Sequence, residues 1–289
     1  MMTEIIKLDT EKNNQRTMDI DVLSTEKILQ KINDEDQLVA SIVAKNIPQI
    51  APLVNQIVDR MQQGGRLFYI GAGTSGRLGV LDAAECPPTY GVDPGLVIGL
   101  IAGGEKAMFI AQEGAEDSLD LAKKDLTNYQ LGDKDTVIGL AASGRTPYVI
   151  GGLQFAREIG ALTGAISCVQ GAEISKFAQY PIEAVTGAEA IMGSTRMKAG
   201  TAQKLILNMI STSVMIKLGK VYKNYMVDLK PSNKKLVIRS KNMIRTLTGV
   251  SEDRAEQLYE ESGHSVKKAL IMEIMNVDKE VAENALRNG

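Results

Sequence analysis

The chain has 289 residues, of which 44% are hydrophobic and 24% charged, a composition typical of a globular protein with about two domains. Lys and Arg number 33 against 35 Asp and Glu, so the net charge is -2 and offers no positive excess for binding nucleic acid. No apolar run reaches the roughly 20 residues of a membrane helix, and the amino terminus lacks the layout of a signal peptide. We therefore expect a cytoplasmic protein that contacts neither membranes nor nucleic acid.

The few cysteines and histidines limit the chemistry. Cys86 and Cys168 are too few for a disulfide framework and lack metal-ligand spacing, so both thiols are expected to be reduced. The single histidine, His264, excludes a His-rich metal site, and we expect it to have a capping or surface role. Acid-base chemistry therefore falls to Asp, Glu, Lys or Tyr.

Helical periodicity begins near residue 24. The spacing of apolar residues predicts one helix over Ser24 to Val43 and another after Pro48. Together with the irregular residues before them, these helices make up an expected N-terminal helical arm, residues 1–54.

Short, continuous apolar runs follow, each separated from the next by helical periodicity. Continuous runs indicate strands that are buried on both faces, and intervening helices indicate a parallel sheet. The predicted strands are Leu67–Ile70, Leu96–Ala102, Thr136–Ala141, Gly164–Val169 and Pro181–Val185. The pattern predicts a doubly wound α/β domain over residues 55–225, closed by a long helix over 198–217.

The remainder of the chain is predicted to be helical, as a small C-terminal domain over residues 226–289. Its expected helices cover 234–247, 251–262, 264–274 and 278–287. Ten Lys or Arg stand against nine Asp or Glu from Lys234 onward, which is less basic than usual for a DNA-reading helix-turn-helix. We therefore expect a packing role.

A glycine-rich turn follows the first predicted strand. Gly71, Gly73 and Gly76 fit the pattern of a dinucleotide-binding fingerprint. That fingerprint also needs an acidic residue about 20 positions further on, whereas the nearest candidate, Glu105, lies 34 residues after Gly71. A nicotinamide cofactor is therefore disfavoured.

Three turns at predicted helix starts carry hydroxyl groups together with Arg or Lys. Free N–H groups and the helix dipole favour anions at such positions, although Ser and Thr also serve there as ordinary N-caps. Their recurrence favours a small phosphorylated ligand. The candidate phosphate-binding residues are Thr74, Ser75, Gly76, Arg77, Ser143, Gly144, Arg145, Thr146, Ser194, Thr195 and Lys198.

Carboxylates provide the candidate acid and base. Glu85 lies near the end of a helix that Pro87 and Pro88 are expected to terminate, and partial burial there would favour its protonated form. A second group, Glu113, Glu116 and Asp117, is expected on the next helix. Spacing alone does not choose among these carboxylates.

Six stretches of the sequence resemble N-acetylmuramic acid 6-phosphate etherases, which have the sugar isomerase (SIS) fold. They are Ile70-Gly-Ala-Gly-Thr-Ser-Gly-Arg77, Leu81-Asp-Ala-Ala-Glu-Cys-Pro-Pro-Thr-Tyr-Gly91, Leu100-Ile-Ala-Gly-Gly104, Glu113-Gly-Ala-Glu-Asp-Ser118, Ala141-Ala-Ser-Gly-Arg-Thr-Pro-Tyr148 and Arg196-Met-Lys-Ala-Gly-Thr-Ala-Gln-Lys204. The resemblance implies cleavage of a D-lactyl ether to N-acetylglucosamine 6-phosphate and D-lactate. It also implies acid-base roles for Glu85 and Glu116.

The implied reaction suits two carboxylates. In the open-chain sugar a base can remove the C2 proton while an acid protonates the departing lactate, after which water adds at C3; this requires neither a metal nor an organic cofactor. The sequence leaves open which glutamate is the acid. Two alternatives of the same fold also stay open, a phosphosugar-sensing regulator and an aldose-ketose isomerase.

The distance between Ser75 and Glu85 bears on whether one chain or two chains form each active site. Ten residues of helix place Glu85 roughly 15 Å from Ser75, beyond the reach from the C6 phosphate of a sugar to its C2 and C3. Either the helix bends early, or two chains share each site. We expect a homodimer with shared active sites.

Overall fold

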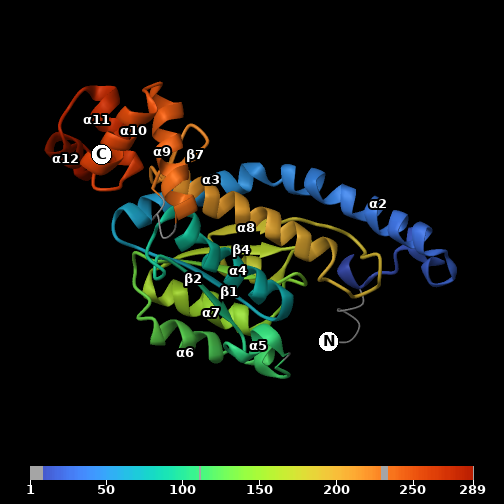
Figure 1. Cartoon of the computed structure of the whole chain (residues 1–289). Helices are drawn as coiled ribbons and strands as arrows, with labels where there is room; N and C mark the ends of the chain where they lie inside the picture. The colour runs from blue at the N-terminus through green and yellow to red at the C-terminus, as the bar shows by residue number, and fades with distance from the viewer. Residues whose placement is uncertain (1–8, 111, 229–233, 289) are drawn as a thin grey trace. The chain divides into compact units, whose positions relative to one another are not determined.

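The computed structural model describes residues 9–110, 112–228 and 234–288 (Figure 1). These residues form two compact units. The first, here called the sheet unit, holds the described residues up to Glu85 together with Pro94–Val214. The second, here called the helical unit, holds Cys86–Asp93 and the described residues from Met215 onward. The sheet unit thus includes the described part of the expected N-terminal arm.

A five-stranded sheet with the order β2-β1-β3-β4-β5 forms the centre of the sheet unit. All neighbouring strands pair in parallel, which confirms the doubly wound α/β prediction. The chain passes from β1 to β2 on one side and then to β3 on the other, so the topological switch point lies between β1 and β3. The strands are β1 (Leu67–Gly71), β2 (Val97–Ile101), β3 (Thr136–Leu140), β4 (Leu162–Ser167) and β5 (Tyr180–Glu183).

Helices cover both faces of this sheet. Figure 1 shows α6 (Leu121–Asn128) and α7 (Pro147–Ile159) on one side of the strands, where Phe68 and Ile70 pack in one core cluster with residues of both helices. On the other side, α3 (Ile47–Gln62) contacts β4 and β5. There α4 (Gly73–Tyr90) packs so closely on the sheet that a Cβ on Gly99 would lie 2.4 Å from the Cα of Val80.

Two hydrogen bonds fix α4 against α8, the long helix over Lys198–Lys217. The Ser75 hydroxyl donates to the side-chain oxygen of Gln203 at 2.8 Å, and the Ser211 hydroxyl donates to Asp82 at 3.0 Å. The first bond joins the earlier residue of each helix and the second bond joins the later residue of each helix. The two helices therefore run parallel. The bounds of α8 confirm the sequence prediction.

Helix α4 differs from its prediction at the C-terminal end. Pro87 and Pro88 were expected to end it, but the helix continues to Tyr90. Each proline removes the hydrogen bond that its own nitrogen would donate, and its ring crowds the carbonyl of the preceding turn, but it still offers a carbonyl to the next turn. The carbonyl of Pro87 still accepts from the N–H of Gly91 at 2.9 Å, which closes the last turn.

Besides the ends of α4 and α8, the described part of the helical unit contains a short hairpin and four helices. The hairpin, β6 (Val221–Tyr222) with β7 (Tyr225–Met226), was not predicted. The four predicted helices are confirmed as α9 (Lys234–Thr248), α10 (Glu252–Glu261), α11 (Val266–Met275) and α12 (Lys279–Asn288). His264 follows α10 with a left-handed backbone, stacks on Tyr259 and lies 2.8 Å from the Glu260 carboxylate.

Short helical segments complete the described chain. Before the sheet lie three 3-10 helices, η1 (Asp9–Glu11), η2 (Gln15–Thr17) and η3 (Ile20–Val22), followed by the predicted helix α2 (Thr25–Ala44). Within the sheet unit lie α5 (Lys106–Phe109), η4 (Ala115–Asp117) and η5 (Glu173–Phe177).

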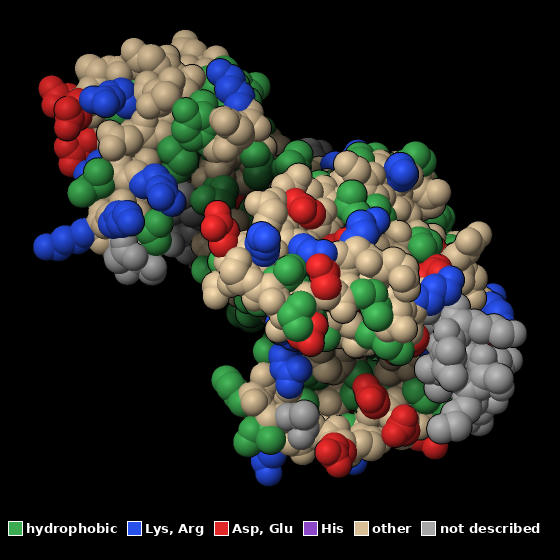
Figure 2. All heavy atoms as spheres, turned by 90° about the vertical axis from the view of Figure 1, so that its right-hand side faces the viewer, with side chains coloured by type: hydrophobic (Ala, Val, Ile, Leu, Met, Phe, Trp, Pro, Cys, Tyr) green, Lys and Arg blue, Asp and Glu red, His purple; other side chains and the backbone are tan. Residues whose placement is uncertain are grey.

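The surface carries charges of both signs. On the face drawn in Figure 2, Lys and Arg side chains are interspersed with Asp and Glu side chains. Among the residues described, no helix has both the length and the apolar character needed to cross a membrane.

A buried ion pair ties α2 to the start of α8. Glu35 and Lys198 are each 2% exposed, and the Lys198 ammonium lies 2.6 Å from the Glu35 carboxylate. Arg16 donates to the same carboxylate through two nitrogens, at 2.5 and 2.9 Å. Burial alone would raise the pKa of Glu35, but the hydrogen bonds and charges of Arg16 and Lys198 outweigh it and lower this pKa to about 2.

Replacing Glu35 tests this ion pair. Glu35→Gln leaves the buried Lys198 ammonium without its anion, so we expect the free energy of unfolding at pH 7 to fall by about 3 kcal/mol. Because the folded-state pKa of Glu35 lies below its ordinary value of 4.5, the ionised carboxylate stabilises the fold above about pH 4.5. This contribution is lost as the pH falls towards about 2. Urea unfolding of both proteins at pH 7 and pH 3 should therefore show a smaller difference at pH 3.

The exposed pair Glu173 and Lys176 provides the control. Glu173→Gln should change the free energy of unfolding little at either pH, because exposed ion pairs contribute little. An equal loss for Glu35→Gln at both pH values would contradict the lowered pKa.

Candidate active site

Two predicted phosphate turns lie at the carboxyl ends of β1 and β3, beside the switch point. Close packing requires glycine in both. A Cβ on Gly76 would lie 2.7 Å from the carbonyl oxygen of Gly71, and one on Gly144 would lie 2.4 Å from the Cβ of Ala172. Gly144 also has a φ of 69°, which favours glycine. The structure thus brings together the turns at 74–77 and 143–146, as the parallel sheet predicts.

The hydroxyl groups of these turns differ in their surroundings. Ser75 is buried, and its hydroxyl already donates to Gln203 on α8. Its backbone N–H lies in the first turn of α4, where the helix dipole favours an anion. Thr74, Ser143, Arg145 and Thr146 are half-buried.

Arg77 holds the segment that follows β2. Its guanidinium donates to the carbonyl oxygens of Met108 at 2.9 Å and Ala107 at 2.7 Å. Those carbonyls belong to α5, which precedes Glu113 and Glu116 in the chain. Arg77, expected among the phosphate ligands, therefore uses two N–H groups to fix the backbone that leads to the second candidate carboxylate.

The third predicted phosphate turn is already occupied by a carboxylate of this chain. Glu189 is fully buried, and it accepts hydrogen bonds from the N–H groups of Lys198 and Ala199 at 2.9 Å each. The Lys198 side chain points instead to Glu35. We therefore correct the expectation for Lys198, whose ammonium has a structural role. Ser194 and Thr195 are half-buried in the same turn.

Glu35 and Glu189 carry no motif that indicates their roles. A buried glutamate is indistinguishable from a surface one in a single sequence, so only the fold identifies these two residues. Glu189 lies nine residues before the N–H group of Lys198 that it binds, so it does not fit the local pattern of an N-cap residue.

Glu116 lies near the first phosphate turn. With Glu113, Gly73 and Arg77 it lines a pocket of about 210 Å³, here called the Glu116 pocket. The prediction that the 113–117 cluster lies on a helix is wrong: it spans a loop and one 3-10 turn, η4. Gly114, whose φ is 77°, separates the two glutamates.

Glu85 lines a different pocket. This one, here called the Glu85 pocket, measures about 170 Å³ and lies between α4 and α8. Its lining residues are Leu78, Leu81, Asp82, Glu85, Lys204, Leu207 and Asn208, none of which lines the Glu116 pocket. Glu85 itself is exposed in this chain, so the partial burial considered from the sequence is not seen.

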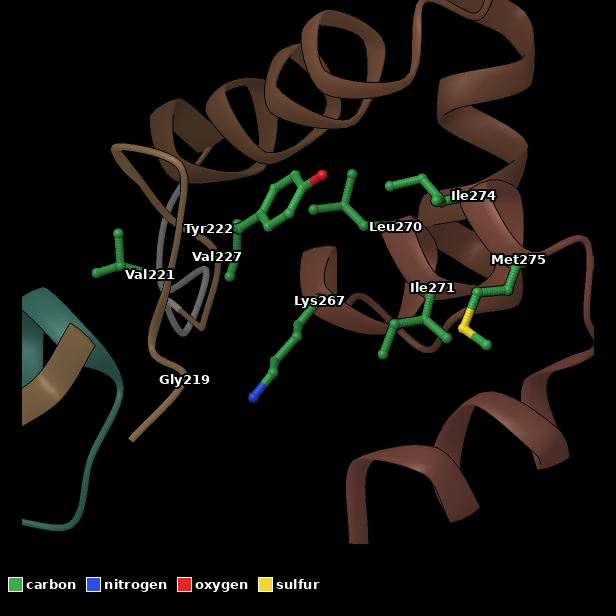
Figure 3. Close-up of a pocket in the computed structure, with 9 residues that line it drawn as sticks. All are labelled: Gly219, Val221, Tyr222, Val227, Lys267, Leu270, Ile271, Ile274 and Met275. Carbon is green, nitrogen blue, oxygen red and sulfur yellow. The ribbon is translucent and has the colours of Figure 1, made fainter. Parts of the chain in front are cut away.

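A third cavity lies within the helical unit and has a different chemistry. It measures about 360 Å³, and Figure 3 shows it lined by apolar side chains of α11 and of the hairpin region. Lys267 is its one charged lining residue, and no carboxylate lines it. Among the described residues, no group of three or more His, Cys, Asp or Glu is placed to hold a metal ion. Both candidate glutamates line pockets of the sheet unit instead.

Comparison with known proteins defines the class. Residues 49–157 match the glucokinase regulatory protein N-terminal SIS domain, and residues 223–287 match the C-terminal lid domain of the same protein. A solved structure of a protein from Escherichia coli CFT073 shares the fold, with a TM-score of 0.50 and 16% identity over 70% of this chain and 96% of that one. The chain is thus an SIS-type α/β protein with a C-terminal helical lid domain.

Curated relatives define the family within this class. The N-acetylmuramic acid 6-phosphate etherase of Clostridium botulinum is 60% identical over 98% of this chain and 94% of its own length. That of Halalkalibacterium halodurans is 57% identical over 98% of this chain and 95% of its own length. The chain belongs to the N-acetylmuramic acid 6-phosphate etherase family, which confirms the resemblance seen in the sequence.

The role of Arg77 is open to a direct test. Arg77→Lys keeps the charge but loses the fork that reaches two carbonyls. We expect amide hydrogen exchange in residues 106–110 to accelerate about tenfold, the effect of losing one ordinary hydrogen bond. Arg157→Lys, an exposed change on α7, should leave this segment unchanged. Unaltered exchange in Arg77→Lys would argue against the positioning role.

Proposed function

We propose that the chain is a carbon-oxygen lyase that converts N-acetylmuramic acid 6-phosphate and water into N-acetylglucosamine 6-phosphate and D-lactate. The single observation that carries this proposal is the identity of 54–60% to curated etherases over nearly the whole chain. The site geometry supports it, because a turn suited to a phosphate and a candidate carboxylate line one pocket.

Two carboxylates can carry out every proton transfer in this reaction. In the open-chain sugar the C2 proton is acidic because it lies next to the C1 aldehyde, and the lactyl ether oxygen lies on C3. One glutamate of the pair Glu85 and Glu116 removes the C2 proton, and the other protonates the departing lactate oxygen. Water then adds at C3 and restores the C2–H bond. Each proton transfer by a positioned side chain accelerates the reaction by about 10²- to 10⁴-fold.

The C6 phosphate anchors the sugar. We propose that it binds at the starts of α4 and α7, through backbone N–H groups and the hydroxyls of Thr74, Ser143 and Thr146. Ser194 and Thr195 are secondary candidates, because Glu189 places a negative charge at the start of α8. The phosphate takes no part in bond making, so its binding energy holds C2 and C3 in position.

A distance favours a site shared by two chains. The acid and the base act on neighbouring sugar atoms, each within about 3 Å, so their oxygens lie less than about 10 Å apart. Gly73 lines the Glu116 pocket, and the 12 residues of continuous helix from Gly73 to Glu85 span about 18 Å. We therefore propose a homodimer in which Glu85 of one chain and Glu116 of the other serve one sugar.

Substitution of each glutamate tests the proposal and assigns the roles. Glu85→Gln and Glu116→Gln should each lower kcat for D-lactate release by at least about 10²-fold, since each removes a group that transfers a proton. In D₂O, the variant that lacks the acid should still exchange the C2 proton without releasing lactate. The variant that lacks the base should do neither.

The exposed neighbour Asp117 provides the control, because Asp117→Asn changes a carboxylate that lines neither pocket. That variant should keep kcat close to the unmodified value, and all variants should keep their thermal unfolding midpoint. If a glutamate variant with an unchanged midpoint retained more than about a tenth of kcat, that residue would lose its assigned role.

A further inference from the structure

The Glu85 pocket contains groups that proton transfer does not use. Gln203 and Ser211 of α8 bond to α4, and Leu207 lies midway between them at the same helical spacing. Lys204 directly follows Gln203, and Asn208 directly follows Leu207. They therefore project from the adjacent strip of α8 and line the same pocket as Glu85.

The side chains of this pocket fall into two chemical groups. Leu78, Leu81 and Leu207 supply apolar surface, whereas Lys204 and Asn208 supply hydrogen-bond donors. Lys204 is exposed where it lines the pocket. Its ammonium is thus available to an anion that also presents a small apolar group.

Asp82 is the carboxylate of this pocket that already has a hydrogen-bond partner on α8. It is half-buried, and its carboxylate already accepts a hydrogen bond from the Ser211 hydroxyl. Burial raises the pKa of Asp82, and hydrogen bonds from Ser211 and Tyr69 and the charge of Lys204 oppose the rise. Lys204 and Asp82 line the same pocket, so the charge of Lys204 acts on Asp82 there.

The Glu85 pocket is large enough for the lactyl group of the substrate but too small for the whole sugar phosphate. Its volume of about 170 Å³ equals about six water molecules at roughly 30 Å³ each. A lactyl group has six heavy atoms, whereas the whole sugar phosphate has several times more. The lactyl group combines a carboxylate with a methyl group. The pocket offers one ammonium and three leucines for these two groups, beside the carboxylates of Asp82 and Glu85.

We propose that Lys204 and Asn208 bind the carboxylate of the lactyl group, while the three leucines contact its methyl group. This inference rests on the proposed function. The carbon that carries the carboxylate also carries the ether oxygen, so a carboxylate held by Lys204 brings that oxygen to Glu85 in the same pocket. Lys204 and Asn208 are therefore specificity-determining residues for the lactyl ether.

The test compares two substrates. One is N-acetylmuramic acid 6-phosphate, and the other is its analogue in which the lactyl carboxylate is a carboxamide. The unmodified enzyme should prefer the acid in kcat/KM by roughly 10- to 100-fold, the effect of a charge-assisted hydrogen bond. Lys204→Met should abolish the preference, and Lys204→Arg should keep much of it. Lys217→Met, an exposed change on the same helix, should keep it fully.

A second readout excludes a merely structural effect. N-acetylglucosamine 6-phosphate lacks the lactyl group, so its inhibition constant should be the same for Lys204→Met and the unmodified enzyme. A full acid preference in Lys204→Met, or an equal weakening of this inhibitor, would overturn the inference. Failure of the proposed function would be distinguishable, because the unmodified enzyme would then release no lactate.

Discussion

The length of one unbroken helix is the constraint on which the site depends. Helix α4 begins at the turn after β1, where the helix dipole and the glycine-shaped backbone favour an anion. It ends at Tyr90, so its two prolines do not interrupt it before Glu85. Within one chain, the continuous helix therefore places Glu85 about 18 Å from the turn that lines the Glu116 pocket. The proposal of a shared site follows from this separation.

Buried carboxylates hold the helices that shape both pockets. Glu189 caps the start of α8, and Glu35 neutralises Lys198 in the same turn. Hydrogen bonds from Ser75 and Ser211 then fix α8 against α4, which creates the groove beside Glu85. The polar residues at the start of α8 therefore stabilise the arrangement of the helices, and the candidate catalytic carboxylates stay on exposed surfaces where a substrate can reach them.

Elements that depend on the local pattern of apolar residues could be predicted from the sequence. The continuous apolar runs predicted all five strands, and helical periodicity predicted α8 and the four C-terminal helices, because burial on a sheet or helix imposes a fixed period. Contacts between distant residues were not readable. The pairing of Lys198 with Glu35 spans 163 positions, and it converted an expected phosphate ligand into a structural residue. The helix expected over the 113–117 cluster failed for a local reason, because Gly114 has a left-handed backbone and only one 3-10 turn follows it.

The most direct test of the shared site mixes two inactive proteins. Glu85→Gln and Glu116→Gln chains, exchanged to equilibrium in equal amounts, should form mixed dimers in which one of the two sites has both glutamates intact. Random exchange makes half of the dimers mixed, so D-lactate release should recover to about one quarter of the unmodified rate. Verified exchange of subunits with no recovery would contradict a site in which Glu85 and Glu116 come from different chains.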